Sequence, residues 1–567
     1  MAKASRVQTA HSSDGLLTLV GYRGDGALML AFDVAPRATD GLAGFAISCT
    51  PPNGKGINLP NRLSFAQPIT NAATQHDWTP SNVAPFQKFR WVDYSGLADP
   101  GEYTYDVSAM YFAGGGALRK GSTAKLTVTY GPFQSGHLAI GFTRSYVSSQ
   151  AYARKFQNKP VRPSKTLDYD TAPYQPAYEY LGVHARRLMF AFLDECVSTP
   201  GATVDMFAYD LDEPDIVAKL VSLKGRLRLY LDDASLHTGD TALEPIAAKR
   251  IAAAGGAVKR GHFKRFAHDK ILILRKPGGA LKVLTGSANF SVRGLYVQAN
   301  SVLVFDDPSI AGLYAQVFDR VWADPSKFAS DPLAGSWHDF HAPNIPPFSV
   351  AFSPHKDPLL SLGRVANAIQ NAKRSVMFAI MELEGGGPVL ADVVNLAARD
   401  NIYSYGVTQS AGGVKLFSAG SHNGTFTPFA FLNGTVPPPF DQETSGGAGQ
   451  VIHHKFVVTD FNDLQAAVFM GSSNLASGGE SDNGDNLLAF TDPEIATIYG
   501  VEAIRLVDHF HFRAVWQNAT THQPLVLQGA TPAAGAKHWW EPYYDPGDGK
   551  SKERLLLSTP KQSAAPA

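Results

Sequence analysis

The chain has 567 residues, more than one hydrophobic core usually holds, so two to four domain-sized units are expected. Its 50 Lys and Arg balance its 50 Asp and Glu, which argues against a sequence-independent nucleic-acid binder, because such proteins carry a basic excess. A local cleft can still be basic. The two cysteines, Cys49 and Cys196, are too few for a disulfide framework or a zinc cluster, and both are expected to be buried.

No targeting or membrane-spanning segment is predicted. The first apolar run, residues 16–20, is short and flanked by polar residues, and no run of about 20 apolar residues occurs. We therefore expect a cytoplasmic protein, or one that is exported without a cleaved signal peptide. We also expect it to act as a monomer.

Residues 1–133 have the pattern of an all-β domain. Apolar residues alternate with their neighbours over 28–34 and 103–111, and turn signals lie at 25–26 and 100–101. The segment 97–109 resembles the corner and following strand of fibronectin type III domains, in which a corner Tyr anchors the turn. These patterns predict an immunoglobulin/fibronectin-like β-sandwich.

The remaining chain alternates between strand-like and helical segments, which predicts an α/β fold. Strands are expected at 204–209, 226–231, 271–274 and 375–380, and helices at 213–223, 243–254 and 389–398. We place a first α/β repeat at 134–345, a second at 346–525, and a linker with an aromatic tail at 526–567. The tail residues Trp539, Trp540, Tyr543 and Tyr544 are expected to pack on the α/β domain.

An internal repeat relates the two α/β segments by a constant 185 positions, as between His268 and His453 (453 − 268). The same offset relates Lys270 to Lys455, Gly286-Ser287 to Gly471-Ser472, and Asn289 to Asn474. Matched apolar residues alone could reflect two similar strands. Matched polar residues indicate a shared function, because polar positions that face solvent are otherwise free to vary.

Each His-x-Lys opens an apolar run, so strand alternation places the two side chains on one face. Each Gly-Ser-x-Asn follows a second apolar run. If the two sets face each other, they form one pocket with two histidines, two lysines and two asparagines. Such a pocket suits a phosphate diester, because lysines and amides can hold its non-bridging oxygens.

These motifs resemble the signature of the phospholipase D superfamily, His-x-Lys-x4-Asp followed by Gly-Ser-x-Asn. The second copy matches in full, with His453, Lys455, Asp460, Gly471, Ser472 and Asn474. The first copy has Arg275 where the family has Asp. The resemblance covers roughly residues 134–525 and implies a two-repeat phospholipase D fold with mixed sheets flanked by helices.

The resemblance implies a two-step reaction without a metal or other cofactor. One histidine attacks phosphorus to form a phosphohistidine, and the other protonates the leaving oxygen and then activates water. The expected catalytic residues are His268, His453, Lys270, Lys455, Asn289, Asn474, Asp485 and Asn300, with Asp460, Ser287 and Ser472 in support.

Asn300 and Asp485 each follow a motif histidine by 32 positions (300 − 268 and 485 − 453). Family members have a carboxylate near this place that accepts the second ring proton. We therefore expect an amide partner for His268 and a carboxylate partner for His453, as tyrosyl-DNA phosphodiesterases, a branch of the superfamily, have. By that analogy His268 is the nucleophile and His453 the acid, although a carboxylate would also strengthen a nucleophile.

Three alternatives stay open at this point. Arg275 either replaces the family Asp as a structural brace or marks a first half with impaired activity. The apolar segment 425–440 either dips into a lipid surface or packs inside the protein. A phospholipid, hydrolysed or transferred to an alcohol, is the leading substrate; a nuclease and an inactive phospholipase-like binding protein are the alternatives.

Overall fold

The computed structural model describes residues 6–561 apart from several short segments. These segments are 71–77, 95–99, 145–151, 153–154, 158, 382–385, 397–398, 400, 411–412, 418–424 and 429–450. The predicted apolar segment 425–440 lies, but for the backbone of its first four residues, outside the described residues.

The N-terminal region consists of two antiparallel four-stranded sheets. One contains β1 (Val7–His11), β2 (Leu17–Arg23), β3 (Leu28–Val34) and β8 (Arg90–Asp93); the other contains β10 (Leu118–Tyr130), β9 (Gly101–Phe112), β4 (Leu42–Thr50) and β5 (Ile57–Asn58). Alternate residues of β3 and β9 enter one shared core, as strand periodicity requires. The predicted all-β region is present, whereas its fibronectin-like identity stays a prediction.

The first α/β half is built on an eight-stranded mixed sheet. Its strands, in spatial order, are β11 (Phe133–Ser135), β12 (Leu138–Phe142), β19 (Ser301–Phe305), β18 (Gly279–Gly286), β17 (Ile271–Lys276), β13 (Thr203–Ala208), β14 (Leu227–Leu231) and β15 (Ala257–Arg260). The main helices are α2 (Gln175–Ser198), α3 (Pro214–Leu223), α4 (Glu244–Ala253) and α6 (Pro308–Ala323). The strands and helices predicted in this half are all present within a few residues.

The second half repeats this arrangement. Its strands, in spatial order, are β20 (His338–Phe340), β21 (Phe348–Ser353), β28 (Asn483–Thr491), β27 (Ala467–Gly471), β26 (Lys455–Thr459), β22 (Ser375–Ile380), β23 (Tyr403–Ser410), β24 (Gly413–Phe417) and β25 (Thr425–Pro428). Its helices include α7 (Leu359–Asn371), α8 (Pro388–Asn395), α9 (Ser477–Asp482) and α10 (Pro493–Gln517). Its first strand, β20, begins a few residues before the predicted boundary at 346.

The two halves exchange backbone contacts in a symmetric way. The short strand β16 (Phe266–Ala267) of the first half pairs with β28 of the second, with Ala267 opposite Gly484. A second bridge joins Ala299 to Ile452. The offset of 185 positions turns the first pair into the second, since Ala267 corresponds to Ile452 and Ala299 to Gly484. A pseudo-two-fold axis therefore passes between the halves, at the place where both motif histidines lie.

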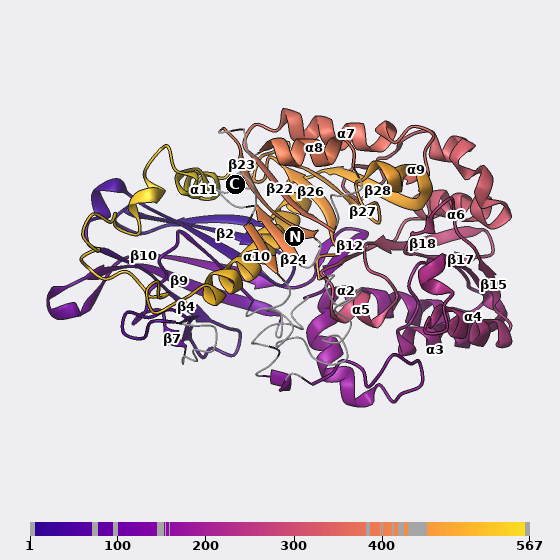
Figure 1. The fold of residues 1–567 in the computed structure, drawn as a ribbon, viewed down its shortest axis with the longest axis horizontal. Coiled ribbons are helices and arrows are strands. Elements are labelled where there is room, and N and C mark those ends of the chain that lie inside the picture. Colours follow the sequence, from indigo (N-terminus) through magenta and orange to yellow (C-terminus); the bar gives the residue numbers. More distant parts are fainter. Residues whose placement is uncertain are drawn as a thin grey trace.

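The β-sandwich is fixed to the second half through a buried charge. The guanidinium of Arg90 on β8 forms ion pairs with Asp508 on α10 and Glu553 on α11 (Gly549–Ser558), and donates to the Tyr405 hydroxyl at 2.8 Å. Figure 1 shows the sandwich on the left, the two α/β sheets with their helices on the right, and α11 above the sandwich. Because a buried charge is costly without its partner, the sandwich is a packed part of the molecule.

The aromatic tail packs on the sandwich, so the prediction that it covers the α/β domain was wrong. Trp539 Nε1 donates to the Leu42 carbonyl at 2.9 Å, and Tyr543 lies in the sandwich core with its ring 4.7 Å from that of Phe89. Aromatic side chains can pack on any nearby apolar surface, so the sequence of the tail does not specify which domain it covers.

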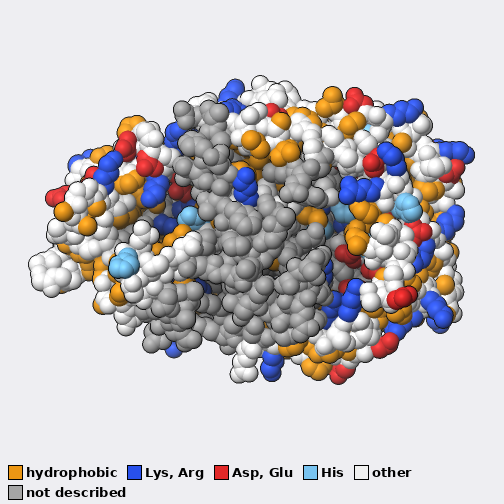
Figure 2. Space-filling model, viewed as in Figure 1, with side chains coloured by type: hydrophobic (Ala, Val, Ile, Leu, Met, Phe, Trp, Pro, Cys, Tyr) orange, Lys and Arg blue, Asp and Glu red, His pale blue; other side chains and the backbone are white. Residues whose placement is uncertain are grey.

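Neither a membrane-spanning helix among the described residues nor a basic stripe on the face drawn in Figure 2 is found. None of the described helices is both long and apolar enough to cross a bilayer. On the face drawn in Figure 2, the described Lys and Arg side chains lie among Asp and Glu side chains.

Candidate active site

The motif histidines occupy sequence-equivalent positions at the junction of the halves. His268 N donates to the Gly484 carbonyl at 2.9 Å, and His453 N donates to the Ala299 carbonyl at 3.2 Å. Both side chains are buried, and the charge of His268 acts on the pKa of His453. The expectation that one pocket unites the two histidines agrees with this arrangement.

Each histidine is bonded to a residue of the opposite half. Nδ1 of His268 donates to Asp485 Oδ1 at 2.7 Å, and Nδ1 of His453 donates to Asn300 Oδ1 at 2.8 Å. The predicted partners, Asn300 for His268 and Asp485 for His453, were therefore wrong. The two-fold axis is the reason: it places the beginning of each half's last strand, β19 or β28, beside the other half's histidine.

The amide of Asn300 is held in one orientation. Its Nδ2 donates to the Gly294 carbonyl at 2.8 Å, which leaves Oδ1 to accept from His453 and from the Ser287 hydroxyl at 2.9 Å. The amide oxygen can only accept, so the proton on His453 Nδ1 is fixed and Nε2 is left for chemistry. The same tautomer follows for His268 when Asp485 is ionised, because the carboxylate then accepts from Nδ1.

The supporting serines brace these strands symmetrically. The Ser287 hydroxyl accepts from Ser301 N at 3.0 Å, and the equivalent Ser472 hydroxyl accepts from Asn486 N at 2.9 Å. The preceding Gly286 and Gly471 have φ values of +141° and +154°, and a Cβ on either would lie 2.3 Å from a backbone oxygen. Only glycine fits there, which explains why both motifs contain it.

The two lysines turn back toward their own histidines. Lys455 Nζ donates to the His453 carbonyl at 2.7 Å, and Lys270 Nζ donates to the His268 carbonyl. Lys270 also lies over the ring of Tyr209 at 5.0 Å, while Lys455 Nζ is 3.5 Å from Met381 Sδ. Tyr209 and Met381 occupy equivalent ends of β13 and β22, as the strand registers show. Both ammonium groups are thus held in the buried site.

The motif asparagines differ in their partners. Asn289 Nδ2 donates to Asp210 Oδ2 at 2.6 Å, whereas its Oδ1 is buried without a hydrogen-bond partner. Asn474 Oδ1 is likewise buried without one. Unpaired buried amide oxygens at a site with several lysines are ready to accept from a ligand or water.

Asp460 and Arg275, which occupy the same motif position, both lie away from the histidines and brace strands. Asp460 Oδ1 accepts from the backbone N–H of Lys373 and Arg374 at 2.8 and 2.7 Å, where β22 begins. Arg275 forms an ion pair with Asp205 on β13 and donates to the Ala315 carbonyl at 3.1 Å. Arg275 therefore acts as a structural replacement, the first of the two readings of the sequence.

Burial controls the protonation of the site. It lowers the pKa of His268 and of His453 well below the usual range, and the charges of Lys270 and Lys455 lower both further. Burial also raises the pKa of Asp485 to about 8 and lowers that of Lys270 to about 8. The His268–Asp485 pair and the neighbouring Lys270 therefore both gain or lose a proton near pH 8.

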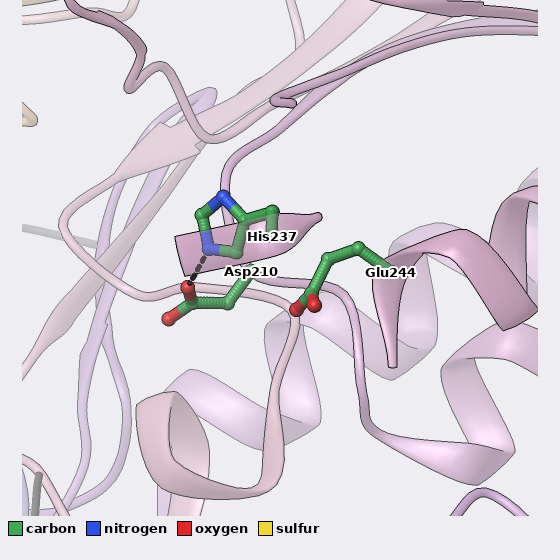
Figure 3. Close-up of side chains that lie close together, drawn as sticks. All are labelled: Asp210, His237 and Glu244. Atoms are coloured by element: carbon green, nitrogen blue, oxygen red, sulfur yellow. Dashed lines mark hydrogen bonds and ion pairs between the residues drawn. The ribbon is translucent and has the colours of Figure 1, made fainter. Parts of the chain in front are cut away.

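A second buried cluster adjoins the first-half motif and was not foreseen from the sequence. His237 Nε2 donates to Asp210 Oδ1 at 2.9 Å and Nδ1 donates to Asp232 Oδ2 at 2.7 Å. Figure 3 shows Asp210 below this imidazole and Glu244 extending from α4 toward both. Strand β13 places Asp210 here, but Tyr209 is 172 positions from its equivalent Met381 (381 − 209), so the offset of 185 did not reveal it.

The described residues contain one group able to hold a metal ion, Asp210, His237 and Glu244, whose ligand atoms lie within 4.8 Å of one another. Burial alone would lower the pKa of His237, but hydrogen bonds to Asp210 and Asp232 outweigh it and raise that pKa to about 10. A protonated imidazole donates from both nitrogens and ligates nothing. With that proton in place, the cluster is an ion-pair network.

Comparison with known proteins agrees with the motifs. Residues 194–322 match the family model described as cardiolipin synthase, PLD-like domain. No curated protein sequence matches the chain. Among solved structures, Nuc from Salmonella typhimurium, a phospholipase D family member, is 23% identical with a TM-score of 0.21, covering 24% of this chain and 86% of its own.

Two larger structures resemble more of the chain. Phosphatidylserine synthase from Haemophilus influenzae is 11% identical with a TM-score of 0.36 and covers 65% of this chain and 90% of its own. Yeast tyrosyl-DNA phosphodiesterase is 11% identical with a TM-score of 0.30 and covers 54% and 88%. None of these TM-scores reaches 0.5, so none of these proteins decides the substrate. Residues 194–322 are thus similar to a phospholipase D-like domain, and motifs that resemble that superfamily's signature occur in both halves of the chain.

Proposed function

We propose that the protein is a phosphodiesterase that cleaves a phospholipid diester through a phosphohistidine intermediate, with His268 as nucleophile and His453 as general acid and base. The observation that carries this proposal is the crossed pair of hydrogen bonds from Nδ1 of each histidine. Those bonds hold both Nε2 atoms free for reaction, with two buried lysines beside them.

The carboxylate of Asp485 supports His268 as the nucleophile. A carboxylate at Nδ1 keeps the proton on that nitrogen, strengthens Nε2 as a base, and offsets the positive charge that the ring gains when Nε2 bonds to phosphorus. The neutral amide of Asn300 gives His453 no such charge. The sequence analysis also assigned His268 as the nucleophile, but on the assumption that its partner was an amide. The structure gives His268 the carboxylate, and the assignment now rests on that carboxylate.

The reaction proceeds in two displacements. The first begins once binding of the diester has left His453 protonated at Nε2 as well as at Nδ1. The Nε2–P bond then forms at His268, the P–O bond to the leaving alcohol breaks, and His453 gives its Nε2 proton to that oxygen. In the second, His453 takes a proton from water, the new O–P bond forms and the Nε2–P bond breaks, which restores both rings. An alcohol that replaces water in the second step would give transfer instead of hydrolysis.

The electrostatics of the resting site favour the entry of an anion. Lys270 and Lys455 both lower the pKa of His453, so an anionic diester bound near them would offset their charge and raise that pKa toward the value a general acid needs. Lys270 and Lys455 would then hold the non-bridging oxygens while charge develops on phosphorus.

A phospholipid is favoured over a nucleic acid by the overall charge. The formal net charge is zero, and the described basic residues in Figure 2 are mixed with acidic ones. The partner, the monomeric state and the compartment stay predictions. Arg275 does not favour an inactive binding protein, because it braces β17 at a distance from the chemistry.

A substrate panel tests the proposal. We expect release of the head group from choline, ethanolamine or glycerol phospholipids in vesicles, and loss of that release in His268→Ala and His453→Ala. Cleavage of single-stranded DNA with steep salt dependence, and none of the lipids, would make the enzyme a nuclease. No cleavage of either class would refute a phosphodiesterase.

A further inference from the structure

We propose that Arg293 is a substrate-binding residue of this site, whose Nε and Nη2 donate to the phosphoryl oxygens of the bound diester. This inference rests on the proposed function and adds a contact that the repeated motifs do not contain. Arg293 lies on α5 (Val292–Tyr296), four positions after Asn289.

Its position beside the site follows from the next residue of α5, because the Gly294 carbonyl accepts from Nδ2 of Asn300, the amide bonded to His453. The electrostatic effects of its side chain agree with that position. The charge of Arg293 lowers the pKa of Asp210, which is bonded to the first-half Asn289, and it lowers the pKa of His453, which belongs to the second half. The guanidinium therefore acts on both halves of the pocket. It lies near the histidine that must protonate the leaving oxygen.

Two of the three guanidinium nitrogens of Arg293 are unsatisfied. Its Nε and Nη2 atoms are both buried without a hydrogen-bond partner. By contrast, the equally polar guanidinium of Arg90 bonds to Asp508, Glu553 and Tyr405 through all three nitrogens. Buried N–H groups are almost always paired, so two unpaired ones on a single charged group indicate an absent acceptor.

Asp210, the carboxylate whose pKa the charge of Arg293 lowers, is already engaged. Asp210 accepts from His237 through Oδ1 and from Asn289 through Oδ2. The cluster described above thus holds a negative charge near Arg293 and fixes one N–H of the Asn289 amide on Asp210. Only the second N–H of that amide is left to donate to a phosphate oxygen. A guanidinium fork supplies two parallel donors, the geometry that suits phosphate oxygens.

The contact belongs to one half alone. The position equivalent to Arg293 in the second half is Gly478, which has no side chain to donate (478 − 293 is 185). The pocket therefore holds two motif lysines that obey the pseudo-symmetry and one arginine that breaks it. We infer that the diester binds with its phosphoryl oxygens displaced toward the first half.

The test compares Arg293→Gln and Arg293→Lys with Arg250→Gln in the full chain. Arg250 on α4 pairs with the exposed Asp168 and serves as the matched control. Inorganic phosphate is the probe, titrated by calorimetry at constant ionic strength, with thermal unfolding of each variant alongside. Turnover of bis(p-nitrophenyl) phosphate is measured in parallel.

We expect Arg293→Gln to weaken phosphate binding roughly 10- to 100-fold and to lower kcat/KM at least as much, with an unchanged or higher unfolding temperature. A structural arginine would lower that temperature instead. Arg293→Lys should recover part of the binding, because it keeps the charge and loses the fork. Arg250→Gln should match wild type.

Phosphate binding by Arg293→Gln as tight as wild type would overturn the inference and leave the proposed function intact, provided that wild type turns over. Full recovery by Arg293→Lys would overturn the forked contact. A wild-type protein that neither binds phosphate nor cleaves any diester would overturn both proposals.

Discussion

Nδ1 of His268 lies 2.7 Å from Oδ1 of Asp485, a residue 217 positions further along the chain. The equivalent bond in the other direction joins His453 to an amide, Asn300. The site is therefore symmetric in shape and asymmetric in charge, and that asymmetry gives the two histidines separate tasks.

The charge asymmetry predicts unequal effects of exchanging these two partners. Asp485→Asn should lower kcat by about a hundred- to ten-thousandfold, because His268 loses the group that fixes its tautomer and offsets its charge. Asn300→Asp should cost no more than about tenfold. Steady-state kinetics with an activated diester measures both; a larger loss for Asn300→Asp would exchange the roles of the histidines.

The roles can also be separated by trapping the intermediate. His453→Ala should form a covalent phosphoenzyme with an ester that has a good leaving group, because the nucleophile remains and little acid catalysis is needed. His268→Ala should form none. Intact-protein mass spectrometry detects the adduct. An adduct on His453 in the His268→Ala protein would reverse the assignment.

The proton equilibria predict a bell-shaped pH dependence. Burial raises the pKa of Asp485 to about 8, so below that pH the His268–Asp485 pair keeps a second proton that blocks Nε2. Burial lowers the pKa of Lys270 to about 8, so above that pH the cation that holds the phosphate is lost. We expect kcat/KM to peak near pH 8. A profile that falls steadily from pH 5 to pH 8 would contradict this account.

Chelation tests whether protein groups carry the whole reaction. Two histidines and two lysines supply the nucleophile, the acid and the charge, so activity should survive exhaustive treatment with a chelator. Phosphodiesterase assays before and after treatment decide the matter. Activity that disappears and returns only with a divalent ion would refute the mechanism and direct attention to Asp210, His237 and Glu244.

The cluster beside the site should make stability depend on pH. The folded-state pKa of His237, about 10, exceeds the unfolded value near 6.5, so its contribution is complete below about pH 6.5 and disappears as the pH rises to about 10. His237→Gln should lower the free energy of unfolding at pH 6 by roughly 2–4 kcal/mol and flatten the decline above pH 7. Denaturant titrations measure it, with His262→Gln, in an exposed pair with Asp233, as the control. Equal slopes in wild type and His237→Gln would exclude the effect.

Periodicity and register predicted the elements well. The expected strand at 375–380 is β22 (Ser375–Ile380), and the expected helix at 213–223 is α3 (Pro214–Leu223), because burial on one face imposes a period that the sequence displays. The offset of 185 also identified Ser287 with Ser472 and His268 with His453, each of which occupies the matching place in its half.

Periodicity and the repeat offset did not predict which distant segments contact each other. Asn300 lies 32 positions after His268 and Asp485 lies 32 after His453, a spacing that fits bonds within a half and bonds across the axis equally well. Asp210 was not predicted because the segment between β13 and β17 is shorter than the equivalent segment between β22 and β26, so the constant offset does not hold for it. Arg293 was not predicted because its equivalent in the second half is Gly478, so comparison of the two halves does not single it out.

The crossed bonds also constrain how the two copies of the repeat can change. A substitution at position 485 alters the histidine of the first copy, and one at position 300 alters the histidine of the second. A single copy would hold a histidine without its partner, so an ancestor with one copy would have worked only as a pair of identical molecules. In a fused chain each position can change independently, so one substitution at position 485 or 300 changes the charge beside one histidine and leaves the other as it was.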